Sequence, residues 1–542
     1  MCSREGLPGV WGVERSEGDG GNWGGPPRPG GLRFDPAGAS HPITVYTGKW
    51  VSSREGVGGG RTTDRTERTT EPSVREGPLL RQCVLTQKES VSAPVASSTQ
   101  DKIQVLQRTL YRTAKADPER RFHALYDKIY RRDILERAWQ QVRANRGAPG
   151  IDQTTIADVE EYGIDRMLDE LATDIKAGTY RPLPARRVWI DKPGSDEQRP
   201  LSIPAVRDRI VQTALKTVIE PIFEADFLGC SFGFRPKRSA HDALQVLIDE
   251  SWRGRRWLVE TDIASCFEEI PHDQLMQAVE ERIVDRNVLK LLRAMLRAGV
   301  MEHGTVRRPV TGTPQGGVAS PLLANIYLHR LDREWQTRGT GVLVRYVDDA
   351  VVLCRNRKEA EVALATLTVI LAELGLEPKA SKTRIVHLEE EGEGVDFLGF
   401  HHRWVHAESE RYRHVTFLAR WPSRKAMQHC RDRIRELTMR RRLLLPVEVI
   451  VADVNRVLRG WAQFFRYGNS ARHFDAIRNY ALMRLALVVA KRHHRSRAYG
   501  WSVIAFQSQN QLGLIDLNGI VVAPRPNRSW KGSPNAGGER RR

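Results

Sequence analysis

The chain has 542 residues, of which 40% are apolar and 28% charged, and its formal net charge is +19. This length is enough for roughly three or four domains with their own cores, whereas no apolar run approaches the roughly 20 residues that a membrane-spanning helix requires. The N-terminus lacks the basic and then apolar stretch of a signal peptide, so we expect a cytoplasmic protein.

The cysteines are scattered along the chain and form no Cys-x-x-Cys pair. There are six of them: Cys2, Cys83, Cys230, Cys266, Cys354 and Cys430. This spacing argues against a disulfide framework and favours free thiols in a reducing compartment. We therefore expect no zinc ion.

The positive charge is concentrated at the C-terminal end. Residues 1–100 have a net charge of +1, residues 101–400 have −1, and residues 401–542 have +19. A basic segment interleaved with aromatic residues is typical of a protein that binds a polyanion, most often nucleic acid. The alternative is a basic face that only contacts solvent.

Residues 1–100 hold 17 of the 44 glycines and almost no periodic apolar pattern. This composition predicts a disordered Gly-rich N-terminal segment. From Asp101 the pattern becomes helical, with amphipathic stretches at 120–142 and 164–176. Between them lies a turn-rich loop that includes Gly147 to Asp152.

Two basic residues flank a predicted hairpin at residues 185–205. Lys192 lies in its turn and Arg199 begins the second extended segment, so the two side chains could clamp a triphosphate. Two exposed hairpin charges are the simpler alternative. A helix is predicted from Val206 to about Phe223.

The next segment, residues 230–246, is predicted to be a loop that leads into a helix. Ser239 is a suitable N-cap residue. Arg235 and Lys237 lie beside Phe232 and Phe234, and cations next to aromatic rings suit a nucleic-acid backbone and its bases.

Acidic residues end two predicted strands. One predicted strand runs from Trp257 to Asp262, where it ends in an acid. Two further short apolar strands, within Leu343 to Cys354, are joined by a turn at Asp348 and Asp349. Close carboxylates repel unless a cation neutralises them, and oxygen ligands of this kind suit Mg²⁺. Alternatively, Asp348 and Asp349 only cap backbone N–H groups of a turn.

Residues 311–331 are predicted to form a Gly-rich loop entering an apolar helix. Gly316 and Gly317 permit close approach of the backbone to a ligand, which the amide of Gln315 could also reach. Beyond the Asp348–Asp349 hairpin we expect a helix at about 358–374, a strand at 395–401, a basic helical segment from near Ser423, and a short turn-rich extension.

Together, the three acids Asp262, Asp348 and Asp349 predict a site for two Mg²⁺ ions. Such a site serves phosphoryl transfer from a nucleoside triphosphate, in which metal ions activate a hydroxyl and neutralise the leaving pyrophosphate. Most of the remaining catalysis in this class of reaction is positioning, which the basic hairpin and the Gly-rich loop could supply.

The order of these motifs resembles that of group II intron-encoded reverse transcriptases with maturase activity, from about residue 105 to 500. The motifs are Arg199-Pro-Leu-Ser-Ile-Pro, Ser231-Phe-Gly-Phe-Arg-Pro, Thr261-Asp-Ile, Thr313-Pro-Gln-Gly-Gly-Val-Ala-Ser-Pro-Leu, Tyr346-Val-Asp-Asp and Phe397-Leu-Gly-Phe.

The resemblance implies an α+β right-hand polymerase fold, with fingers and an antiparallel palm sheet followed by an α-helical thumb and maturase domain. The implied division is a disordered segment at 1–100, an N-terminal extension at 101–180, fingers and palm at 181–405, thumb and maturase at 406–500, and a basic turn-rich tail at 501–542.

The resemblance also implies roles for single residues. Asp262, Asp348 and Asp349 would be catalytic and would bind the metal ions together with Ile263. The incoming dNTP would meet Lys192, Arg199, Phe267, Gln315 and Gly316. The primer and template would contact Arg235, Lys237, Lys382, Leu398 and Gly399, and the loop at Gly147 to Asp152 would touch the template.

The basic C-terminal region resembles the part of the family that binds the intron RNA. The candidates for RNA binding there are Arg456, Arg459, Arg466 and Tyr467. Trp461 and Phe465 lie four residues apart on one helix face, which favours a place in the core over a contact with RNA.

The sequence departs from the family pattern at a few positions. Val347 replaces the alanine that is more usual before the two acids, and Ser265 to Glu269 differ from the common Gly-Cys-Phe-Asp-Asn. No cysteine follows Cys430, so we expect no C-terminal endonuclease module.

The leading hypothesis is an RNA-directed DNA polymerase that also assists intron splicing and supports retrohoming by target-primed reverse transcription. Its partners would be intron RNA, an RNA template, a DNA primer or target, and dNTPs, in a cytoplasmic ribonucleoprotein at the nucleoid. The alternatives are a non-catalytic RNA-binding splicing factor and a reverse transcriptase of the defence or retron type.

Overall fold

A computed structural model describes residues 99–526, except 192–197, 303, 309, 314, 390–391, 408–409, 411–413, 507–512 and 518. All of these residues belong to one unit of the chain, Ser90–Arg542. The first 98 residues, for which disorder was predicted, lie outside the described residues.

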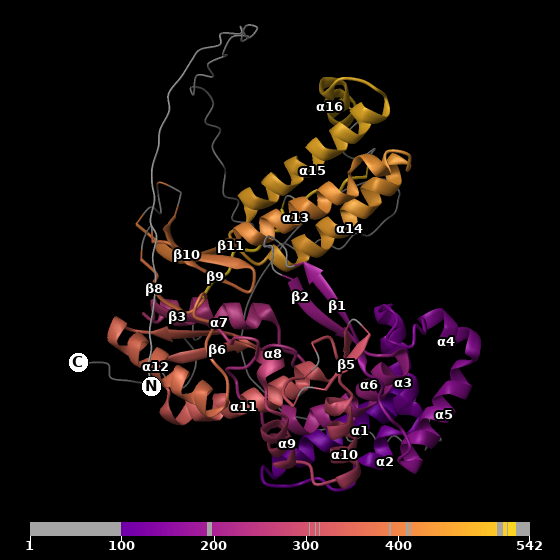
Figure 1. Ribbon diagram of the computed structural model, residues 1–542. Helices are drawn as coiled ribbons and strands as arrows, with labels where there is room; N and C mark the ends of the chain where they lie inside the picture. Colours follow the sequence, from indigo (N-terminus) through magenta and orange to yellow (C-terminus); the bar gives the residue numbers. More distant parts are fainter. Residues whose placement is uncertain are drawn as a thin grey trace, which may run out of the picture. The chain divides into compact units, whose positions relative to one another are not determined.

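The helices are shown in Figure 1. They are α1 (Thr99–Ala116), α2 (Tyr126–Ile129), α3 (Arg132–Asn145), α4 (Ile156–Tyr162), α5 (Ile164–Ala177), α6 (Val206–Glu224), α7 (Ala240–Trp252), α8 (Cys266–Glu269), α9 (His272–Glu280), α10 (Arg286–Arg297), α11 (Ser320–Arg338), α12 (Arg357–Glu373), α13 (Arg424–Leu437), α14 (Val447–Phe465), α15 (Ala471–Arg492) and α16 (Arg497–Phe506). No helix in the described ranges is long and apolar enough to cross a membrane.

The strands form three sheets. They are β1 (Ala185–Asp191), β2 (Gln198–Ile203), β3 (Trp257–Asp262), β4 (Val300–Glu302), β5 (Thr305–Arg307), β6 (Val342–Tyr346), β7 (Asp349–Cys354), β8 (Arg384–His387), β9 (Val395–Phe397), β10 (Phe400–His406) and β11 (Thr416–Pro422). The strand orders are β2-β1-β4-β5, β6-β7-β3-β8 and β11-β10-β9. The mixed helix and sheet content agrees with the expected α+β class.

The sheet β6-β7-β3-β8 is antiparallel throughout and is buried on both faces. Because successive side chains of a strand point to opposite faces, β7 divides its side chains between two cores: Val352 and Cys354 join one, Val351 and Leu353 the other. Full burial of such side chains contributes about 1.5–3 kcal/mol each. The prediction of two apolar strands joined at Asp348 and Asp349 is confirmed.

The first core joins one face of this sheet to helices that include α1, α3, α6, α11 and α12. In α6, most side chains around the whole helix are buried, so packing rather than an amphipathic stripe stabilises it. The predicted loop at 147–152 lies against this region: Pro149 O accepts two hydrogen bonds from Arg186, and Gly150 packs on the backbone of Ala205.

The second core joins the opposite face of the sheet to α7, the sheet β11-β10-β9 and the helices α13–α15, which lie together in Figure 1. Helix α7 begins at the predicted cap: Ser239 and Asp242 form a capping box. Ser423 caps α13, close to the predicted start of the basic helical segment. Phe465 is buried and Trp461 packs against the same core, as predicted.

Two predicted boundaries do not coincide with the ends of structural elements. The expected helical domain at 406–500 begins with strand β11, which pairs with β10 over seven residue pairs, so the helices start only at Arg424. The expected tail at 501–542 is not all turns, because α16 extends to Phe506. The segment that follows α16 contacts α14: the side chain of Asn455 donates a hydrogen bond to Gly513 O and accepts one from Ile515 N.

Candidate active site

The acids predicted to be catalytic lie together at one end of the two central strands, β3 and β7, of the antiparallel sheet. Asp262 ends β3, Asp349 begins β7, and the two are direct cross-strand partners. Asp348 lies in the turn between β6 and β7, and its carbonyl oxygen accepts a hydrogen bond of 3.1 Å from Ile263 N. All four residues line a pocket of about 620 Å³.

The negative charge of this cluster is poorly compensated. Burial, followed by the charges of Asp348 and Asp262, raises the pKa of Asp349 to about 7. Burial also raises the pKa of Asp348. Carboxylates directly opposite each other in a sheet destabilise it. A cation bound between these acids would therefore stabilise both the fold and the ionised carboxylates.

Lys382 supplies one such cation. Its Nζ lies 2.5 Å from Asp262 Oδ2, and this hydrogen bond raises the pKa of Lys382 although burial alone would lower it. The sequence predicted Lys382 as a contact of the primer or template, and its side chain lies against the acids. A backbone hydrogen bond of 2.7 Å from Lys379 N to Asp262 O brings the segment that carries Lys382 next to the end of β3. The two segments are far apart in the chain.

The donor set fits a hard divalent cation. Carboxylate oxygens are the ligands that Mg²⁺ prefers, and burial raises the pKa values of Asp348 and Asp349 although Lys382 lowers both. In the described part of the chain, no group of three or more His, Cys, Asp or Glu side chains is already arranged around a metal position, and Asp262 is held by Lys382 instead.

The turn that carries the acids has a strained backbone. Val347 is 2% exposed and has φ = 61°, a value that is unusual for a β-branched residue. Its carbonyl oxygen accepts a hydrogen bond of 3.1 Å from Arg345 Nη1. Gly233 packs directly on this turn: a Cβ there would lie 2.5 Å from Val347 Cγ2 and 2.9 Å from Val347 N.

Arg345 and Asp332 form a fully buried ion pair beneath this turn. The guanidinium donates to both carboxylate oxygens, at 2.7 and 2.6 Å, and also to Asn325 Oδ1 and Ser231 Oγ. No local pattern in the sequence predicts this pair, because Asp332 lies on α11 and Arg345 on β6.

Of the residues predicted to bind the dNTP, Arg199, Phe267 and Gln315 line the acid pocket. Arg199 lowers the pKa of Asp348, opposing the effect of burial. Gly316 is not among the lining residues; its φ is 108° and a Cβ would lie 2.5 Å from Ser202 O, so glycine is required there for packing. Lys192 lies outside the described residues.

Of the predicted primer and template residues, Leu398 lines the acid pocket together with Lys382. Leu398 and Gly399 have φ values of 49° and 80°, which suit a two-residue hairpin turn. They join β9 to β10, so the predicted continuous strand at 395–401 is wrong: it is interrupted at this turn.

Arg235 does not have the exposed position that a primer or template contact requires. It is 7% exposed; its guanidinium pairs with Glu224 at 2.8 Å and donates to the carbonyl oxygens of Leu228 and Ser231. These internal bonds engage its guanidinium, so the structure does not support the predicted contact of Arg235 with primer or template. Lys237 is exposed, and Phe234, 57% exposed, lines the acid pocket.

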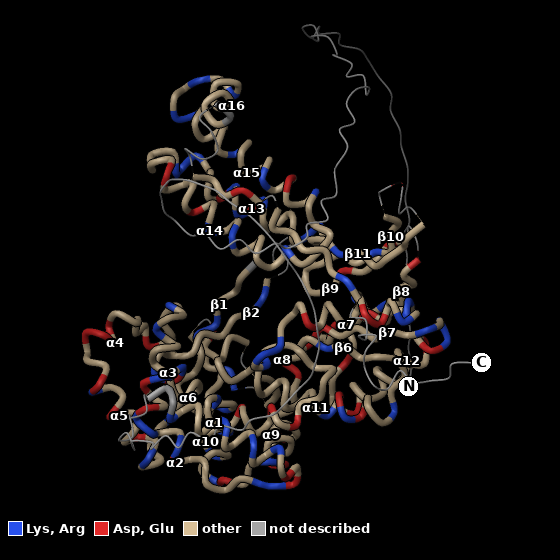
Figure 2. The backbone as a smooth tube through the Cα atoms, turned by 180° about the vertical axis from the view of Figure 1, so that it is seen from behind, with Lys and Arg blue, Asp and Glu red and all other residues tan. Residues whose placement is uncertain are grey.

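The predicted RNA-binding residues lie on α14 and just beyond it, away from the lining of the acid pocket. Arg456 and Arg459 are exposed on α14, and Arg456 pairs with Asp453 at 2.9 Å. Arg466 lies over the ring of Tyr467, 5.2 Å from its centroid. Lys and Arg also recur along α13, α15 and β11 (Figure 2).

Comparison with known proteins places these features in a family. A model of "Reverse transcriptase (RNA-dependent DNA polymerase)" matches residues 190–402, and a model of "Group II intron, maturase-specific domain" matches residues 427–503. Protein YkfC of Escherichia coli (strain K12) is 35% identical over 364 residues, which are 60% of this chain and 93% of that protein. The chain belongs to the group II intron reverse transcriptases.

Further relatives of this group II intron reverse transcriptase are intron-encoded. The group II intron-encoded protein LtrA of Lactococcus lactis subsp. cremoris is 41% identical over 214 residues, 39% of this chain and 35% of LtrA. An uncharacterized 91 kDa protein in the cob intron of Schizosaccharomyces pombe is 38% identical over 208 residues, 38% of this chain and 25% of that protein. The chain thus matches about a third or less of these two relatives.

A solved structure, a partial Cas6-RT-Cas1–Cas2 complex, matches 43% of this chain and 38% of its own chain at 23% identity with a TM-score of 0.30. The sequence relatives, not this structure, carry the assignment. They identify an RNA-dependent DNA polymerase region followed by a maturase region.

Proposed function

We propose that this group II intron reverse transcriptase copies RNA into DNA at the pocket that contains Asp262, Asp348 and Asp349. The observation that carries the proposal is the cross-strand pairing of Asp262 with Asp349 at one end of the central strands β3 and β7, beside Asp348. Asp262 is buried and Asp348 and Asp349 are half-buried beside it, and carboxylates crowded together in this way are costly to a fold unless they are fully compensated. A catalytic role accounts for their presence.

Asp262, Asp348 and Asp349 are the side chains that would hold two Mg²⁺ ions, with the backbone of Ile263 beside them. Bound there, the ions would supply charge neutralisation and activation of the primer hydroxyl. Lys382 would then exchange its contact with Asp262 for a contact with the nucleic acid or with solvent.

The other pocket residues would position the substrates. Arg199 would neutralise triphosphate oxygens, since it already interacts with the charge of Asp348. Phe267 would lie against the sugar of the dNTP and disfavour a 2′-hydroxyl. The turn at Leu398 and Gly399 would support the primer end. Lys192 is proposed for the triphosphate from its sequence alone.

The second part of the proposal concerns RNA. The helices α13–α16 and the segments around them would bind the intron RNA and assist its splicing, with Arg456, Arg459, Arg466 and Tyr467 as contacts. The net charge of +19 in residues 401–542 supports this role. We propose further that the protein supports retrohoming by target-primed reverse transcription.

The test is primer extension by the purified full chain on an RNA template with dNTPs and Mg²⁺. Asp348→Ala should abolish synthesis while the protein remains folded, and Asp273→Ala, an exposed acid in the first turn of α9, should retain it. If the folded wild type binds RNA but makes no DNA, the polymerase proposal is wrong and the chain acts as a non-catalytic splicing factor.

A further inference from the structure

A second and larger hollow lies between the strands β8–β11 and the helices α13 and α15. Its volume is about 1340 Å³, above the roughly 300–1,000 Å³ of a small-molecule pocket. Among the described residues only Lys425 lines both this hollow and the acid pocket. Six of its lining residues are basic: Arg384, Arg403, Arg424, Lys425, Arg431 and Arg472.

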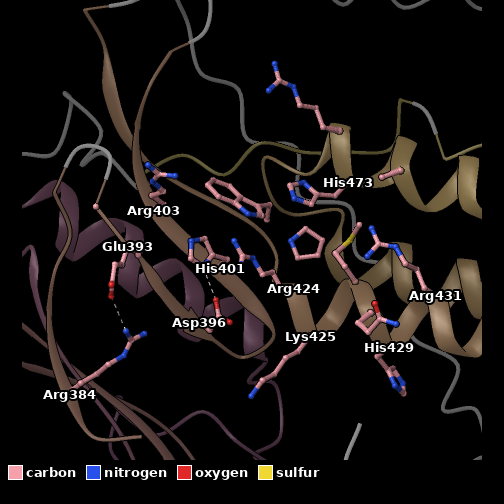
Figure 3. A pocket seen from close by; sticks show the side chains of 18 residues that line it. Arg384, Glu393, Asp396, His401, Arg403, Arg424, Lys425, His429, Arg431 and His473 are labelled. Atoms are coloured by element: carbon pink, nitrogen blue, oxygen red, sulfur yellow. Dashed lines mark hydrogen bonds and ion pairs between the residues drawn. The ribbon is translucent and has the colours of Figure 1, made fainter. Parts of the chain in front are cut away.

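The two acids that line this basic hollow already have partners. Glu393 lies 3.6 Å from Arg384, and Asp396 accepts a hydrogen bond of 2.7 Å from His401 Nδ1. Figure 3 shows both contacts on the strand side of the hollow, with Arg431 on the helix side. Arg384 also pairs with Glu260, at 2.8 Å, so the acids around the hollow compensate the strand side and not the cations of α13.

Three cations on α13 are the most available. Within the described ranges, no carboxylate lies within ion-pair distance of Arg424, Lys425 or Arg431. Arg424 and Lys425 occupy the first turn of α13, which contains no acid. Since the helix dipole disfavours cations at an N-terminus, helix stability does not explain them, whereas an anionic ligand does.

Aromatic rings adjoin these cations. Trp421 of β11 is half-buried and pairs across the sheet with His401 of β10, the ring centroids being 5.3 Å apart. The ring of His473 is nearly parallel to that of Trp421, with an interplanar angle of 16° and a centroid distance of 6.0 Å. Burial lowers the pKa of His473, so its ring is neutral at pH 7. Its Nδ1 is buried and has no hydrogen-bond partner in the described structure.

We propose that the basic hollow binds a single-stranded polynucleotide, with a base against Trp421 and His473 and phosphates on Arg424 and Arg431. Aromatic faces bind bases that are not already stacked, which excludes the interior of a duplex. The buried Nδ1 of His473 provides a partner for a sugar or base group. This inference rests on the proposed nucleic-acid function but names a site separate from the acids.

The experiment measures binding of a fluorescein-labelled oligonucleotide of about 12 nucleotides to the full-length protein by fluorescence anisotropy. Single-stranded RNA and DNA of one sequence are compared, each with saturating unlabelled RNA–DNA hybrid present to fill the polymerase site. The variants are Trp421→Ala, Trp421→Phe and the double variant Arg424→Gln with Arg431→Gln. Arg433→Gln is the matched control, since Arg433 lies on the same helix but pairs with Glu436.

We expect Trp421→Ala to weaken binding by about tenfold, since one base–aromatic stack is lost, while Trp421→Phe keeps most of it. The double arginine variant should reduce the slope of log K against log salt by about 1.4. Arg433→Gln should change neither. Tighter binding of RNA than DNA would identify RNA as the ligand, and equal binding would identify the shared backbone and bases.

The proposal is overturned if hybrid displaces the labelled strand completely, or if Trp421→Ala and Arg433→Gln behave alike. Because Trp421→Phe retains a ring, its normal binding shows that loss in Trp421→Ala is not misfolding. Primer extension on a pre-annealed hybrid separates the two proposals. If the protein does not extend the primer but still binds the single strand in a way that depends on Trp421, the proposed polymerase function is wrong and the proposed site in the basic hollow stands.

Discussion

Arg345 and Asp332 form an ion pair in which both side chains are completely buried. The same guanidinium donates to the carbonyl oxygen of Val347, immediately before Asp348. The pair therefore connects helix α11 to the turn that carries the acids. Removing one member of a buried pair leaves the other charge without a partner, whereas a surface pair contributes little.

We predict that Asp332→Asn lowers the free energy of unfolding by about 3–5 kcal/mol, measured by urea denaturation. Arg338→Gln is the control, because Arg338 pairs with Glu373 on the surface, and it should cost less than about 1 kcal/mol. Equal losses in the two variants would show that the buried pair has no special role.

We predict that Gly233→Ala displaces the turn at Val347 and lowers the rate of primer extension at least about tenfold, because a misplaced reacting group costs this much or more. The added Cβ would lie 2.9 Å from Val347 N, a backbone atom that cannot move alone. Gly229→Ala, in the same loop, meets no atom within 4 Å and should extend primers normally. A fully active Gly233→Ala enzyme would contradict a rigid turn.

We predict that Lys382→Met lowers the Mg²⁺ concentration needed for half-maximal primer extension by a few-fold. Lys382 holds Asp262 at 2.5 Å, so its removal frees a carboxylate and increases the negative charge of the cluster; the effect is modest because Lys382 is half-exposed. Lys358→Met on α12, an exposed lysine, is the control. A higher Mg²⁺ requirement in Lys382→Met would show that the lysine assists rather than competes.

We predict that His402 makes the fold less stable as the pH falls below about 6.5. Burial, followed by the charge of Arg420, lowers its pKa to about 3, and neither ring nitrogen has a hydrogen-bond partner in the described structure. Between the two pKa values His402 is protonated in the unfolded chain but neutral in the folded chain. The contribution of neutral His402 to the free energy of unfolding is therefore full above the pKa of the unfolded state and is lost as the pH falls toward the pKa of the folded state.

The size of this effect at pH 5 is about 2 kcal/mol relative to pH 7.5. His402→Leu should reduce the pH dependence of the free energy of unfolding, measured by urea denaturation, by that amount, and His123→Gln, a change of an exposed histidine, should leave it unchanged. The hypothesis fails if wild type and His402→Leu lose stability in parallel over this range.

The sequence by itself determined the strand at 257–262, the pair of strands at 343–354 and the acids at their ends, because apolar β-branched runs bounded by Asp are a local signal. It also determined the Ser239 cap, the place of Phe465 in the core and, through the order of its motifs, the family. These features depend on residues that are neighbours in the chain.

Only the tertiary structure decided how distant residues meet. Arg235 is part of a motif with a basic and aromatic character, yet Glu224 and three backbone carbonyl oxygens bind it inside the protein. Lys382 reaches Asp262 across 120 residues, and Trp421 meets His473 across an interface between a sheet and a helix. Such contacts depend on the packing of whole elements, and no local pattern of residues encodes them.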